Sequence, residues 1–265
     1  MDSTTTTKKE IKHDFPTEIV TLPSKGYFYP EDSPLASGTI EIKYMTAREE
    51  DILTSRNLIQ KGIVLDKLME SIIVSPINMD ELLLGDKNAI MISTRILGYG
   101  SKYEFELTDP DTGQKQRDFV DLNSLATKNI DFDSHTKGVN KFTFELPISK
   151  KNIEFKLLTH GDEKEISEEL KRLKKFTKVS GIDPDITTRL KKAIISVDGD
   201  TDRGVVNKFV DGQFLAQDSR AFREHLAEVT PDVDMTYTYT SDFDGEEREA
   251  TVPMTVEFFW PKTTK

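Results

Sequence analysis

Residues 141–178 decide the fold class, and they read KFTFELPISKKNIEFKLLTHGDEKEISEELKRLKKFTK. Apolar and polar residues alternate over 141–146 and again over 152–157, a pattern that predicts two strands joined as a β-hairpin. From 162 to about 178 the period changes to that of a helix, with a buried stripe at Ile166, Leu170 and Leu173. Acids precede bases along this helix, as the helix dipole favours. A hairpin followed by an amphipathic helix indicates an α+β fold.

The chain before this hairpin is predicted to contain two strands, three helices and another hairpin. The strands are expected at 18–22 and 38–44, with a turn at Pro23-Ser-Lys-Gly26 after the first. Thr46-Ala-Arg-Glu49 is a capping box, in which a hydroxyl and a carboxylate bond the first amides of a helix that should run to about Leu58. The remaining elements are expected over 63–74 and 86–97 for the helices and over 103–122 for the hairpin, with its turn at 109–113.

The chain after the 162–178 helix is predicted to form two more helices and a last hairpin. The helices are expected over 184–196 and 218–229, and the strands of the hairpin over 234–240 and 249–260. The predicted fold is therefore α+β, with helical bundle segments combined with β-hairpins. The expected division of the chain is a disordered tail over 1–17, a strand-led helical unit over 18–100, a β-hairpin region over 101–160, a helical region over 161–230 and a C-terminal β-hairpin over 231–265.

Composition excludes several classes of site. The 265 residues carry a formal net charge of −11, which argues against binding to nucleic acid or to an anionic membrane surface. The chain has no cysteine, so it cannot form a disulfide, a thiolate zinc site or an iron–sulfur cluster. The four histidines are scattered singly, so we expect no metal and no cofactor. No apolar run reaches the roughly 20 residues that span a bilayer, and we expect a soluble protein that functions in a cytoplasm.

Catalytic signatures are absent from the sequence. It contains no Walker-type phosphate loop, no nucleophile-elbow pattern and no His-Glu-x-x-His. His160 beside Gly161 is either a general base or a histidine at the surface or near a helix N-cap, and we favour the second interpretation. Asp198 to Gly204 resembles a calcium loop, but the positions that need Gly and Glu are Arg203 and Phe209, so a solvated acidic turn is favoured. We predict that the protein is not an enzyme.

Two kinds of segment are candidate partner-binding sites. Aromatic residues lie beside proline near both ends of the chain, and they are either core residues or contact hot spots. The segment 232–249 carries seven acids and one base, so it is either a solvated loop or an acidic surface for a basic partner. The candidate residues are Tyr27, Phe28, Tyr29, Asp242, Asp244, Glu246, Glu247 and Trp260.

Several segments, taken in order, resemble one family, the T4-like bacteriophage baseplate hub assembly chaperones, also described as baseplate hub subunits. Together they extend over nearly all of residues 19–261, and their order and spacing carry the resemblance. They are Leu22-Pro-Ser-Lys-Gly-Tyr-Phe-Tyr29, Gly38-Thr-Ile-Glu-Ile42, Met45-Thr-Ala-Arg-Glu-Glu-Asp51, Ile59-Gln-Lys-Gly62, Leu65-Asp-Lys-Leu68, Gly85-Asp-Lys-Asn88, Arg95-Ile-Leu-Gly-Tyr-Gly100, Asp218-Ser-Arg220 and Phe258-Phe-Trp-Pro261.

The resemblance implies a fold detail that this sequence changes. Members of the family often carry Cys-x-x-Cys-Gly knuckles in two hairpins. The matching positions here are Asp109 and Thr112 before Gly113, and Ser241 and Asp244 before Gly245. No thiol is present, so zinc is not carried over, and we expect two hairpins that resemble metal-free zinc-ribbon knuckles.

The resemblance also implies the function. It indicates a non-enzymatic tail assembly protein that helps to build the central baseplate hub of a contractile tail by binding hub proteins, as an assembly chaperone. The alternatives are a permanent structural subunit of the virion baseplate hub and, less favoured, a hydrolase acting in tail assembly. The implied partners are phage baseplate hub or tail proteins. The implied location is the host cytoplasm during assembly, or the virion if the protein is a subunit.

Overall fold

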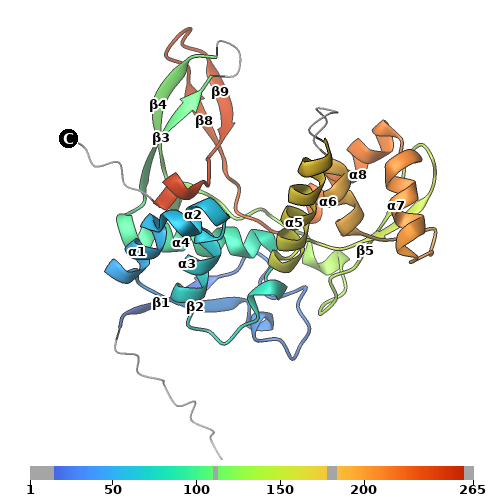
Figure 1. The fold of residues 1–265 in the computed structure, drawn as a ribbon, viewed down its shortest axis with the longest axis horizontal. Helices are drawn as coiled ribbons and strands as arrows, with labels where there is room; N and C mark the ends of the chain where they lie inside the picture. Colours follow the sequence, from blue (N-terminus) through green and yellow to red (C-terminus); the bar gives the residue numbers. More distant parts are fainter. Residues whose placement is uncertain (1–14, 110–112, 178–183, 260–265) are drawn as a thin grey trace, which may run out of the picture.

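The computed structural model describes residues 15–109, 113–177 and 184–259 (Figure 1). In these ranges it has an α+β fold of helices and small antiparallel sheets, as the sequence predicts. The predicted tail lies almost wholly outside these ranges, since the description starts at Phe15. The described residues also include five short 3-10 helices, which lie between or after the main elements: η1 (Pro34–Ser37), η2 (Met79–Glu81), η3 (Leu122–Ser124), η4 (Phe132–Ser134) and η5 (Val256–Phe259).

The N-terminal part is a two-stranded sheet followed by four helices. The strands are antiparallel, with Val20 opposite Ile40. The predicted capping box of Thr46 and Glu49 is present, but the helix that follows it is interrupted at Ser55, whose backbone is extended. The elements are β1 (Thr17–Thr21), β2 (Thr39–Lys43), α1 (Ala47–Thr54), α2 (Arg56–Lys61), α3 (Val64–Ile72) and α4 (Leu84–Tyr99).

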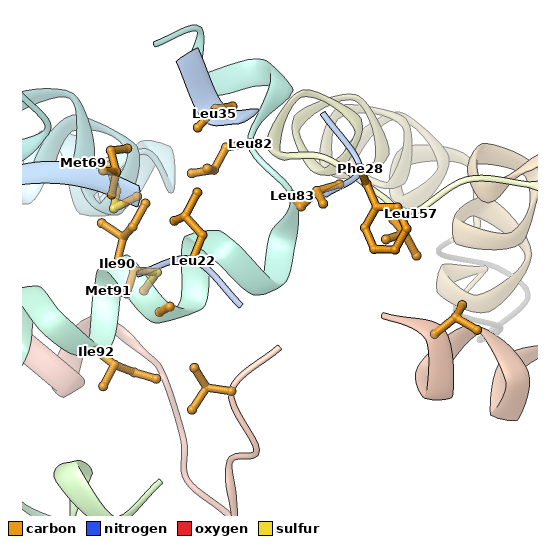
Figure 2. Close-up of a cluster of buried hydrophobic side chains, with 14 of the residues drawn as sticks. Leu22, Phe28, Leu35, Met69, Leu82, Leu83, Ile90, Met91, Ile92 and Leu157 are labelled. Carbon is orange, nitrogen blue, oxygen red and sulfur yellow. The ribbon is translucent and has the colours of Figure 1, made fainter. Parts of the chain in front are cut away.

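Helix α4 lies at the centre of the core. Its sequence is apolar on more than one side, and the structure buries residues around much of its circumference. Ile90 and Met91 contribute to a cluster that also includes Leu22 and, from α3, Met69 (Figure 2). Burying apolar side chains on several faces of one helix stabilises the fold and ties the surrounding segments together.

Two hairpins form an arm that projects from the helical body (Figure 1). The first hairpin pairs β3 (Lys102–Thr108) with β4 (Lys115–Asp121), and the second pairs β8 (Thr236–Thr240) with β9 (Glu247–Thr251). They pack face to face, with Phe105 edge-on to Tyr237 at 5.5 Å between ring centroids. The last strand is shorter than predicted, because it ends at Thr251 and is followed by η5.

The remaining helices surround a three-stranded sheet. The sheet has the order β5 (Phe142–Glu145), β6 (Asn152–Phe155), β7 (Ile194–Val197), and the helices are α5 (His160–Thr177), α6 (Asp185–Ala193), α7 (Arg203–Gly212) and α8 (Ala216–Val229). The helix predicted over 184–196 is wrong at its end: the chain leaves the helix after Ala193 and joins β6 as a strand. Helix α7 was not predicted.

A row of aromatic side chains joins the N-terminal part to the three-stranded sheet and α8. Phe28 packs on Phe142 at 5.2 Å, Phe142 stacks on Phe155 at 5.3 Å, and Phe155 meets Phe222 of α8 edge-on at 5.1 Å between centroids. Contacts of this kind add to the burial of the rings. The 22–29 segment is thereby connected to the three-stranded sheet and to α8.

Candidate functional site

The turn after β1 is held by backbone geometry. Lys25 N–H donates to the carbonyl of Leu22 at 2.9 Å, and Gly26 has a φ of +75°. A Cβ at Gly26 would lie 2.5 Å from the carbonyl oxygen of Ala36. The position therefore needs glycine for two reasons, its left-handed backbone and the close approach of another segment.

A buried carboxylate anchors this turn to the first turn of α4. Asp86 is fully buried and accepts hydrogen bonds from Ser24 N–H at 2.9 Å, from the Ser24 hydroxyl at 2.6 Å and from the Tyr29 hydroxyl at 2.6 Å. The Tyr29 oxygen in turn accepts from Leu83 N–H at 2.9 Å. Burial raises the pKa of Asp86, and burial together with the Asp86 carboxylate raises that of Tyr29.

The first turn of α4 also contacts two other segments of the chain. Gly85 lies against another segment so closely that a Cβ there would be 1.8 Å from the carbonyl oxygen of Pro231. Lys87 Nζ is 3.0 Å from Nδ1 of His160, and Asn88 donates to the carboxylate of Asp232 at 3.1 Å. The start of α4, over residues 83–88, therefore joins the 22–29 turn, the start of α5 and the chain that leads into β8. The local sequence does not reveal this junction.

The structure places the N-terminal candidate residues in the interior. Phe28 is 1% exposed and Tyr29 is 4% exposed, so neither presents a contact surface in this conformation. Tyr27 is half-buried and donates its hydroxyl to the carbonyl of His135 at 2.9 Å. Their aromatic rings pack within the core, which was one of the two interpretations, and their binding to a partner stays a prediction.

The knuckle positions of the two hairpins come together at the end of the arm. In each turn the first knuckle residue accepts from the glycine N–H that closes the turn, Gly113 to Asp109 and Gly245 to Ser241. The Ser241 hydroxyl donates to Asp109 at 3.2 Å, and the Arg248 guanidinium donates to both Asp109 and Asp244. Charge-assisted hydrogen bonds thus connect the two turns. Thr112, the remaining knuckle position, lies outside the described residues.

The acidic candidates lie on the tip of β8 and β9. Asp242, Asp244, Glu246 and Glu247 are all exposed, and Asp244 also pairs with Arg248. The backbone of the tip is fixed, since Asp242 N–H donates to the Gln116 side chain of the other hairpin at 3.1 Å. Between these acids Phe243 is 40% exposed, an apolar side chain that sequence reasoning did not select.

The last candidate, Trp260, lies outside the described residues. The two residues before it are core residues, because Phe258 and Phe259 are almost fully buried. Phe258 meets Tyr103 edge-on at 4.8 Å, and its carbonyl accepts from Arg95 Nε at 2.9 Å. These contacts hold η5 at the base of the arm, against α4.

Two further sequence candidates have structural roles. His160 is 3% exposed and stands at the first position of α5, so of the two favoured positions, at the surface or near a helix N-cap, the structure shows the second. In the 198–204 turn, the Asp202 side chain accepts from Gly204 N–H and caps α7.

Within the described ranges, no group of three or more His, Asp and Glu side chains is placed to hold a metal ion. The helices of the same ranges include none with the length and apolar character that crossing a membrane requires.

Comparison with known protein families identifies the family of this chain. Residues 16–260 match the family described as T4 bacteriophage base plate protein. The chain belongs to this family. No curated protein and no solved structure gave a significant match. Family membership gives the chain a structural or assembly role connected with the phage baseplate and implies baseplate proteins as its partners. The matched region includes the junction at α4 and both hairpins of the arm.

Proposed function

We propose that this family member is a non-enzymatic tail assembly protein, which helps to build the central baseplate hub by binding hub proteins as an assembly chaperone. The observation that carries the proposal is the arm. Its two hairpins are joined at their turns by Arg248, and its tip exposes four acids around Phe243, of which Asp244 is paired with Arg248. A rigid element that presents an apolar side chain within a charged rim has the usual composition of a contact surface.

The proposed mechanism separates two contributions to binding. The carboxylates of Asp242, Glu246 and Glu247 attract a basic surface of a hub protein and speed its approach, an effect that salt screens. Phe243 then enters an apolar pocket of the partner and slows dissociation. The backbone bonds at the tip reduce the conformational entropy that binding would otherwise lose.

Association kinetics with purified hub proteins test the charge contribution. The variant Asp242→Asn/Glu246→Gln/Glu247→Gln should associate about tenfold more slowly at low salt and should lose most of its salt dependence. The control removes three exposed acids elsewhere, through Asp51→Asn on α1 and Glu224→Gln/Glu228→Gln on α8, with the same change in net charge. Equal slowing in both variants would show that only the overall charge matters and would contradict a specific role for the tip.

Dissociation kinetics test the apolar contribution. Phe243→Ala should dissociate about tenfold faster with little change in the thermal melt, because the ring is partly exposed in the free protein. Phe119→Ala is the matched control, since Phe119 is 58% exposed on β4, away from the turn. If both variants bind as the wild type does, the arm is not the contact surface.

Mass spectrometry of purified virions distinguishes the chaperone from the alternative, a permanent subunit of the baseplate hub. A chaperone should be present in infected cells at the time of tail assembly and absent from finished particles. A stoichiometric amount in the particles would favour the subunit.

A further inference from the structure

His160 is a buried histidine at the point where α5 meets the N-terminal helices. Its backbone N–H donates to the Leu82 carbonyl at 2.7 Å, and Thr159 forms a β-bridge with Leu83, so the start of α5 is bound to the segment before α4. The imidazole lies at two adjoining clefts of about 490 and 450 Å³, which share the side chains of Asp66 and Lys164. Opening of this contact would expose the imidazole to water.

The contacts of the ring define its protonation state. Lys87 Nζ lies 3.0 Å from Nδ1. An ammonium group can only donate, so Nδ1 must accept and the ring proton resides on Nε2. Nε2 faces the Asp66 carboxylate at 3.5 Å. The closed arrangement of Lys87, His160 and Asp66 therefore suits a neutral imidazole.

Protonation of the ring would leave an excess of positive charge. The charged groups that face it are Lys87 on α4, Asp66 on α3, Lys164 on α5 and Asp80 on η2. Lys164 and Asp80 pair with each other at 2.8 Å, and Lys87 is 3.4 Å from Asp66. A protonated His160 would lose the bond from Lys87 and become a second cation beside a single carboxylate. Burial, followed by Lys87, lowers the pKa of His160 in the closed structure.

We propose that His160 is a pH-sensitive latch: the neutral imidazole holds the first turn of α5 on α3 and α4, and the protonated imidazole releases it. In the open state the ring is in water and has its ordinary pKa of about 6.5. The open state therefore binds protons more readily than the closed state. The equilibrium constant for opening increases by up to tenfold per pH unit as the pH falls below about 6.5. It becomes constant below the pKa of His160 in the closed state. Above about pH 6.5 the latch is closed.

Hydrogen exchange of the full-length protein, measured between pH 7.5 and 5, tests the latch. The readout is the exchange rate of the α5 first-turn amides in the wild type divided by that in His160→Gln, a ratio that cancels the intrinsic pH dependence of exchange. The ratio should rise by up to tenfold per pH unit below about pH 6.5. His225→Gln is the matched control, because His225 on α8 is also partly buried with a lowered pKa but stacks on Phe144, and this variant should keep the wild-type response in α5.

Two results would overturn the latch. One is a ratio that does not change with pH. The other is a rise of equal size in α5 and in the α8 peptides, which would indicate global unfolding. If His160→Gln does not fold, Lys87→Met gives an independent test by NMR titration of the histidine ring protons. Removing the ammonium should move the pKa of His160 up towards 6.5, and an unchanged titration would contradict the proposed role of Lys87.

Discussion

Replacing Tyr29 with Phe should destabilise the protein far more than the same change two residues earlier, at Tyr27. Both tyrosines use their hydroxyl as a donor, but to different acceptors. Tyr27 donates to a neutral backbone carbonyl at 2.9 Å, whereas Tyr29 donates to the buried carboxylate of Asp86 at 2.6 Å. The Tyr29 oxygen also accepts from Leu83 N–H. The two variants remove the same atom from the same side-chain type in one segment.

The expected magnitudes follow from these partners. A hydrogen bond to a neutral group contributes about 1 kcal/mol, so Tyr27→Phe should lower the free energy of unfolding by about that amount. A bond to a charged group contributes about 2 kcal/mol, and a buried N–H left without an acceptor costs about 1–3 kcal/mol. Tyr29→Phe should therefore lower the free energy of unfolding by about 3–5 kcal/mol.

Urea denaturation at pH 7 measures both values, with the slope of each transition checked against the wild type so that the two free energies are comparable. A double-mutant cycle of Tyr29→Phe with Asp86→Asn should give a coupling energy of about 2 kcal/mol, because the charged acceptor is absent from the second background. If Tyr29→Phe costs no more than Tyr27→Phe, or if the cycle shows no coupling, the network around Asp86 does not anchor the turn as we infer.

The remaining predictions concern acid stability, backbone strain and the arm. Although burial opposes its ionisation, hydrogen bonds from lysine, serine and threonine lower the pKa of Glu49 to about 2 from an ordinary 4.5. This carboxylate therefore adds about 3 kcal/mol to the free energy of unfolding above about pH 4.5, and this contribution is lost as the pH falls to 2. In acid denaturation, the free energy of unfolding of Glu49→Gln should fall by correspondingly less than that of the wild type. In the same urea assay, Gly26→Ala should lower the free energy of unfolding by about 3 kcal/mol or more, and Gly62→Ala by about 1 kcal/mol. Both glycines have a positive φ, but only Gly26 lacks room for a Cβ. Equal losses would contradict this explanation. Arg248→Met should lower the free energy of unfolding by about 3 kcal/mol, because it removes the cation that pairs with the buried carboxylate of Asp109. Arg117→Met, on the exposed face of β4, should lower it by less than about 0.5 kcal/mol. A small loss for Arg248→Met would show that the turns are held by other contacts.

The α+β class and most elements of the fold could be predicted, because their signals lie within a few residues of one another. The capping box at Thr46 and Glu49 and the turn glycines Gly113 and Gly245, both with positive φ, are local features. One error occurs where a distant partner overrides a local pattern, and another where a local capping signal is missed. Ile194 to Val197 continues the apolar pattern of α6, but pairing with β6, some forty residues earlier, makes it a strand. At the start of α7 the sequence pattern indicates only an acidic turn, whereas in the structure Asp202 caps the helix.

The sequence by itself determined most of the helices, hairpins and turns, since capping bonds, turn glycines and amphipathic periods act over four residues or fewer. It also determined that thiolate chemistry is excluded, because the chain has no cysteine. Only the tertiary structure decided which candidate side chains are available. It buried Tyr29 on Asp86 and joined the two hairpins through Asp109 and Arg248, while leaving Phe243 exposed between the acids of the tip. The physical reason is that burial and the pairing of charges depend on segments 57 to 139 residues apart meeting in space, and no local pattern specifies which segments meet.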